Sequence, residues 1–132
     1  MATRSQIREA IRAIAEPAGF STTFNYSPAQ IFEDELPALK VFFNSGETEY
    51  DFDDTGITEG QVILEIMLRE PGNIDDALDQ KATAVQKLLR ENPLLDGLIE
   101  GMNRTNFAYD RDSETTIGEL QLTYTIQYLD ED

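Results

Sequence analysis

The sequence of 132 residues predicts one α+β domain over residues 1–132. We expect a mostly antiparallel sheet with two main helices packed on one face and a short extra helix. Three observations predict this fold class: two segments repeat apolar residues with the period of a helix, several segments alternate apolar and polar residues, and the order is helix, strands, helix, strands. A chain of this length can bury a core without disulfides.

The first helix is predicted over residues 5–16. Thr3 and Gln6 have the spacing of a capping box at its start, and Pro17 and Gly19 end it. The apolar side chains that share one face at helical spacing are Ile7, Ala10, Ile11 and Ile14.

The strand predictions rest on β-type residues and on alternation. The five predicted strands are residues 21–26, 39–43, 61–70, 106–109 and 120–128. The last strand is the clearest, because Leu122, Tyr124 and Ile126 alternate with polar residues. A strand that is polar on one side indicates an antiparallel sheet with helices on the other side. Residues 44–60 are acidic and interrupted by glycine, which predicts a loop or a loosely paired hairpin.

The longest helix is predicted over residues 74–91, with Asn73 or Asp75 as its N-cap. Asp75, Asp76 and Asp79 near its start suit the positive end of the helix dipole. The buried stripe of this helix consists of Leu78, Ala82, Val85 and Leu89. Pro93 is predicted to open the short extra helix, because proline suits the first helical position.

The composition excludes several classes of function. The chain has no cysteine and no histidine, which rules out disulfides, thiolate nucleophiles and zinc sites built from these residues. Its 26 acidic and 10 basic residues give a net charge of −16, which repels nucleic acids and anionic membranes. No apolar run is long enough to span a membrane. We therefore expect a soluble, intracellular protein that is not an enzyme and needs no cofactor for chemistry.

Residues 51–56 form the one segment that resembles a metal-binding loop. Asp51, Asp53, Thr55 and Gly56 match the opening of a calcium loop, but Val62 stands at the twelfth position, where a glutamate is needed. The EF-hand interpretation therefore fails. A solvated acidic loop is the simpler interpretation, and weak cation binding or contact with a partner is the alternative.

The charges are segregated along the chain. Arg4, Arg8 and Arg12 lie four residues apart, on one edge of the first predicted helix. Residues 33–54, which include Asp51, Asp53 and Asp54, hold eight acidic residues against one lysine. The arginines either form a solvated face with local glutamate pairs, or meet the acidic region of another copy. Contacts of the second kind close into rings, and divalent cations can screen the acidic surfaces where they meet.

Six stretches, in order, resemble those of a known family. They are FEDELPALKV at 32–41, LEIML at 64–68, DDALD at 75–79, PLLDGLI at 93–99, YDRD at 109–112 and LTYTIQY at 122–128. The family is the minor tail protein U, or tail terminator, of lambda-like siphophages. The likeness extends over nearly the whole chain.

The resemblance implies a structural protein of the virion tail, present in the host cytoplasm during assembly. Family members form a homohexameric ring on the finished tail tube, where they contact the tail tube protein and the head-completion (connector) protein. The resemblance also implies that Asp75 takes part in divalent-dependent ring formation, with Mg²⁺ as the cation. The subunit-interface candidates are Arg4, Arg8, Arg12, Asp51, Asp53, Asp54, Asp75 and Asp79.

Two alternatives remain at this point. The net charge of −16 is also compatible with an acidic binding module that mimics DNA and sequesters a basic host protein. Against this alternative, the carboxylates cluster in predicted loops and at a helix start and are not spread over one long face. A divalent-dependent hydrolase ranks last, because no carboxylate pair stands out.

Overall fold

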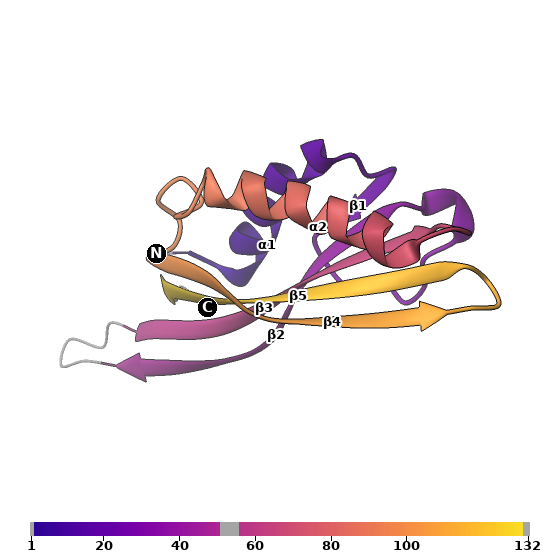
Figure 1. Ribbon diagram of the computed structural model, residues 1–132. Helices are drawn as coiled ribbons and strands as arrows, with labels where there is room; N and C mark the ends of the chain where they lie inside the picture. The colour runs from indigo at the N-terminus through magenta and orange to yellow at the C-terminus, as the bar shows by residue number, and fades with distance from the viewer. Residues whose placement is uncertain (1, 51–55, 131–132) are drawn as a thin grey trace.

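The computed structural model describes residues 2–50 and 56–130 and has an α+β fold (Figure 1). Two helices lie over one face of a five-stranded sheet. The helices are α1 (Arg4–Ala15) and α2 (Ile74–Arg90), and the strands are β1 (Thr22–Phe24), β2 (Ala38–Tyr50), β3 (Gly56–Arg69), β4 (Gly101–Asp112) and β5 (Ile117–Leu129). Two single turns of 3₁₀ helix, Glu16–Ala18 and Glu33–Glu35, complete the regular structure of the described residues.

The sheet has the strand order β1-β2-β3-β5-β4. β1 pairs in parallel with β2, and the other three pairings are antiparallel. The predicted class is therefore confirmed: two helices and a mostly antiparallel sheet. None of the described helices is long and apolar enough to cross a membrane.

The two helices begin where local hydrogen bonds predict. At α1, the Gln6 amide donates to Thr3 Oγ1 at 3.1 Å, and the Thr3 amide donates to Gln6 Oε1 at 2.9 Å. This is the predicted capping box. At α2, the Asp76 amide donates to the side chain of Asn73, which confirms Asn73 as the N-cap.

The core lies between the helices and the sheet. α1 buries Ile7, Ile11 and Ala15, and α2 buries the predicted stripe. On the sheet, the alternation predicted for the last strand is confirmed, because every second residue of β5 from Gly118 to Tyr128 is buried. Gly118 lies under the start of α2, where an added Cβ would come within 2.6 Å of Ile74 Cγ1.

The sheet is longer at one end than the sequence predicts. β2 continues through Tyr50 and β3 starts at Gly56, so most of residues 44–60 form a regular hairpin. Figure 1 shows this hairpin extending beyond the helices. β2 pairs with β1 only over Ala38–Lys40, so the rest of its outer edge has no strand partner in the described chain. The described residues 44–50 and 56–61 are called the acidic hairpin below.

The predicted short extra helix is absent. Residues 91–98 form consecutive turns. Leu95, Asp96 and Gly97 have φ values of 49°, 60° and 85°, which a right-handed helix cannot accommodate. The apolar pattern that predicted a helix arises because Leu95 and Ile99 are buried at the edge of the core.

Candidate functional site

Two of the predicted interface residues, Asp75 and Asp79, lie together where the first turns of α2 face β4. Arg111 of β4 donates from Nε to Asp75 Oδ1 at 2.6 Å and from Nη2 to Asp75 Oδ2 at 3.1 Å. The hydroxyl of Tyr109 donates to Asp79, and the Arg111 guanidinium lies 4.6 Å from the centre of the Tyr109 ring. These four side chains tie α2 to β4.

The same contacts shift the pKa values of Asp75, Arg111 and Tyr109. The hydrogen bonds from Arg111 hold the pKa of Asp75 below its usual value, and Asp75 in turn raises the pKa of Arg111. The hydrogen bond to Asp79 raises the pKa of Tyr109. Both oxygens of Asp75 are used by Arg111, so a cation at Asp75 has to compete with a guanidinium. Within the described residues, no group of three or more acidic side chains is placed to hold a metal ion.

The three arginines of α1 do not form one uniform basic edge. Arg12 Nη2 lies 2.6 Å from Glu9 Oε1, and Arg12 Nη1 lies 3.1 Å from Glu16 Oε2. These local pairs raise the pKa of Arg12 and lower that of Glu9. Arg8 is half-buried, and its Nε has no hydrogen-bond partner among the described residues. Arg4 is exposed at the base of the acidic hairpin, in a hollow shared with Phe43 and other residues.

The predicted acidic surface is partly described. Asp51, Asp53 and Asp54 lie outside the described residues. Glu47 and Glu49 on β2 and Glu59 on β3 are all exposed on the acidic hairpin. Glu47 and Glu59 are directly paired across the two strands, an arrangement of like charges that destabilises a sheet.

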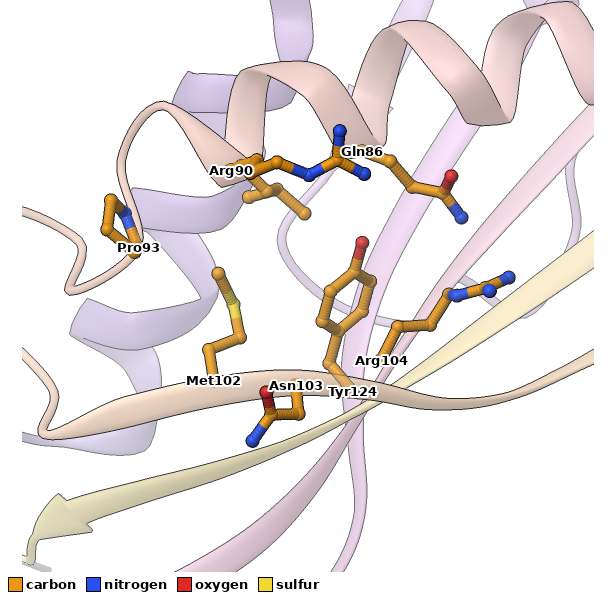
Figure 2. A pocket seen from close by; sticks show the side chains of 8 residues that line it. Gln86, Arg90, Pro93, Met102, Asn103, Arg104 and Tyr124 are labelled. Atoms are coloured by element: carbon orange, nitrogen blue, oxygen red, sulfur yellow. The ribbon is translucent and has the colours of Figure 1, made fainter.

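A cavity between α2 and β4 is a feature that the sequence did not predict. It has a volume of about 280 Å³, and Figure 2 shows Tyr124 standing between the helix and the strand with its hydroxyl pointing towards α2. Arg90 of α2 and Arg104 of β4 line the cavity. A second hollow of about 260 Å³ shares Gln86 and Arg104 with the first. The two hollows together are called the α2–β4 groove below.

The sequence signal for this groove was obscured by a bulge. Met102 and Arg104 face the helix side of β4, and so do Phe107, Tyr109 and Arg111. A register shift between Arg104 and Asn106 breaks the alternation, so that the strand was recognised only over residues 106–109.

Buried carboxyl groups lie on the face of the sheet opposite the helices. Glu65 is buried, with Lys40 Nζ at 3.5 Å from its Oε2, and it accepts a hydrogen bond of 3.0 Å from Gln121. Burial raises the pKa of the neighbouring Glu119 to about 7, and the hydrogen bond to Glu65 and the charges of Glu65 and Asp110 act in the same direction. Lys40 partly opposes this shift. Glu119 therefore keeps its proton in the folded protein at mildly acidic pH.

Replacing Glu119 with glutamine is expected to stabilise the protein at pH 8 and to have little effect at pH 4. The folded pKa of about 7 lies above the ordinary value of 4.5, so stability is lost as the pH rises towards and through 7. Glutamine has no charge to bury. We expect the Tm at pH 8 to rise by roughly 3–6 °C, equivalent to about 1 kcal/mol.

The control for this experiment is Glu114→Gln in the exposed turn between β4 and β5, which removes the same charge from an exposed position. Thermal unfolding of both variants at the two pH values separates local burial from the overall charge. An equal rise in Tm for Glu119→Gln at pH 4 and pH 8 would contradict the assignment.

Within the described residues, these surfaces define the class of protein as a small α+β domain with two open sheet edges, a basic groove and an acidic hairpin. The comparison with protein families makes this class specific. The family model of phage minor tail protein U matches residues 2–128, and the chain belongs to this family of phage tail proteins. The resemblance noted in the sequence is confirmed, and the chain is a structural protein of the virion tail.

A solved structure shows the same fold. A chain in the virion of a native gene transfer agent particle is similar with a TM-score of 0.55 and 13% sequence identity. The similarity covers 96% of this chain and 93% of that chain. A search of curated protein sequences returned no significant match.

Proposed function

We propose that the protein is a tail terminator that assembles into a hexameric ring on the end of the tail tube. In this proposal the ring stops further addition of the tail tube protein and then offers its outer surface to the head-completion protein. Assembly takes place in the host cytoplasm. Membership of the minor tail protein U family over residues 2–128 is the observation that carries the proposal.

The distribution of charge supports self-association. The acidic hairpin belongs to β2 and β3, whereas the α2–β4 groove lies at the far edge of the sheet, beyond β5. Complementary surfaces at two different places on one chain lead to head-to-tail contacts, which close into a ring when the rotation between copies allows it. The strong negative charge adds repulsion between copies, which divalent cations such as Mg²⁺ reduce.

The test is the length of tails assembled without this protein. We expect electron micrographs of tails from a deletion strain to show overlong tubes, and a plasmid copy of the gene to restore a single length. Tails of normal length in the deletion strain would refute the proposal. Light scattering of the purified chain should give six times the chain mass, and equal masses with and without millimolar Mg²⁺ would remove the cation from the proposal.

A further inference from the structure

The α2–β4 groove is a basic site in a strongly acidic chain. Five of the ten basic side chains are engaged inside the molecule: Arg12 with Glu9 and Glu16, Lys40 with Glu65, Arg69 with Glu33, Lys81 with backbone carbonyls and Arg111 with Asp75. Arg90 and Arg104 form no ion pair within the described residues, and both line the groove. Arg104 lies over the Phe107 ring at 5.7 Å. Asp79 also lines the groove and accepts a hydrogen bond from Tyr109, so the groove presents two guanidinium groups against one carboxylate.

The hydroxyl of Tyr124 adds a hydrogen-bond donor beside the two guanidinium groups. Tyr124 is only 6% exposed, and its hydroxyl has no hydrogen-bond partner among the described residues. Figure 2 shows this hydroxyl pointing into the cavity below Arg90. The hydroxyl opens onto the cavity and is not one of the buried unpaired atoms of the described residues, so an acceptor that enters the cavity takes the place of water as its partner. An acceptor between two guanidinium groups and a phenol is best supplied by a carboxylate.

The walls of the groove indicate that the carboxylate belongs to a polypeptide. Phe107 is 54% exposed on the helix side of β4, although its neighbour on β5, Leu122, is buried. β4 is also an edge strand of the sheet, so its outer backbone groups have no strand partner in the described chain. An apolar side chain and an open strand edge favour a protein segment over a free anion.

The acidic hairpin has the complementary features. Glu47, Glu49 and Glu59 are exposed carboxylates, and Ile57 is an exposed apolar side chain at the same end of the hairpin. The unfavourable pairing of Glu47 with Glu59 is relieved when a guanidinium group lies between them. Because β5 lies between the hairpin and β4 in the sheet, the partner is the hairpin of another copy.

We propose that the α2–β4 groove of one copy receives the acidic hairpin of the next copy, with Glu47 and Glu59 facing Arg90 and Arg104 and a carboxylate oxygen accepting from Tyr124. This inference rests on the proposed terminator function and specifies the two surfaces that join neighbouring subunits. It assigns the basic side of the contact to the groove, in place of the arginines of α1.

The test uses charge reversal on each side and then on both. One variant carries Arg90→Glu and Arg104→Glu, and the other carries Glu47→Arg and Glu59→Arg. Each variant alone is expected to leave tails overlong in the deletion strain, because its groove and hairpin have the same sign. Co-expression of the two is expected to restore normal length, since copies of the two kinds alternate around the ring. Lys87→Glu with Glu114→Arg is the control, because both residues are exposed and neither lines the groove.

The Tyr124→Phe variant tests the hydroxyl separately. Loss of one hydrogen bond to a carboxylate should weaken association about tenfold in sedimentation. Thermal stability should be unchanged, because the hydroxyl opens onto the cavity and forms no hydrogen bond within the described residues. A merely structural tyrosine would show lower stability and unchanged association.

The outcomes separate this inference from the terminator function. Normal tails with either reversal variant alone would overturn the groove contact while the terminator function stands. Overlong tails with each variant and with their co-expression would show that the groove binds a different virion protein, which also overturns it. Normal tails in the deletion strain itself would instead refute the terminator function.

Discussion

Replacing Leu64 with alanine is expected to lower the free energy of unfolding by about 2–5 kcal/mol. Leu64 is fully buried in the middle of β3, the central strand. It is paired with Val41 on β2 and with Leu122 on β5, both buried on the helix side. The cost combines the lost transfer of the side chain from water with the cavity that it leaves. Denaturant unfolding monitored by circular dichroism gives the measurement.

The matched control is Leu94→Ala, the same substitution at a side chain that is 46% exposed in the turns after α2. We expect this control to change the unfolding free energy by less than about 0.5 kcal/mol. Similar decreases in the free energy of unfolding for the two variants would show that packing at Leu64 on β3 does not stabilise the core. Both the acidic hairpin and the α2–β4 groove depend on this sheet, so Leu64→Ala should also reduce assembly at 37 °C.

Gly118→Val is expected to destabilise the protein by about 2–3 kcal/mol. The first atom beyond Cα would already lie 2.6 Å from Ile74 Cγ1 and 3.2 Å from Leu78 Cδ1. Ile74 and Leu78 belong to α2, so the helix has to move away from β5. We expect a decrease of roughly 6–12 °C in Tm. The movement should also separate Asp75 from Arg111 and widen the α2–β4 groove.

The control for the glycine variant is Ala108→Val. Ala108 is exposed on β4, is paired with Gln121 and lies on the face that carries no helix. Valine favours strands, so this variant should be as stable as the parent protein. A Gly118→Val protein that melts at the parental temperature would mean that α2 does not need close approach to the sheet.

Local signals in the sequence were sufficient to predict the helices and the central strands. The Thr3–Gln6 capping box and the Asn73 cap each depend on residues three apart, and both were confirmed. The alternation of the last strand was confirmed because one face meets the core and the other does not. The class of the sheet follows from these local patterns.

Features that depend on distant parts of the chain were missed. The acidic hairpin has few apolar residues, and its strands exist because β5 pairs with β3 as far as Ile57. The turns at 91–98 were read as a helix because burial of Leu95 and Ile99 imitates helical spacing. The bulge in β4 shifts the alternation of the strand between Arg104 and Phe107. The sequence therefore does not show that both side chains face the helices, and it does not predict the basic groove.

The fold brings some of the predicted site residues together and leaves others apart, for the same reason. Asp75 and Asp79 are one helical turn apart, and the fold brings them to Tyr109 and Arg111, about thirty residues further along the chain. The arginines lie four residues apart on α1, but Glu9 on the same helix and Glu16 directly after it neutralise Arg12. The roles of these residues at a subunit interface stay predictions.

The placement of the two open edges on opposite sides of one sheet has a geometric consequence. A contact from the acidic hairpin to the α2–β4 groove carries a direction, because its two halves are different surfaces. Every copy that joins such a chain offers the same free end as the copy before it. A turn that does not divide the full circle evenly, or a rise per copy, gives a spiral that grows indefinitely. The angle between the hairpin and the groove, more than the strength of their attraction, therefore decides whether the copies close into a ring of six.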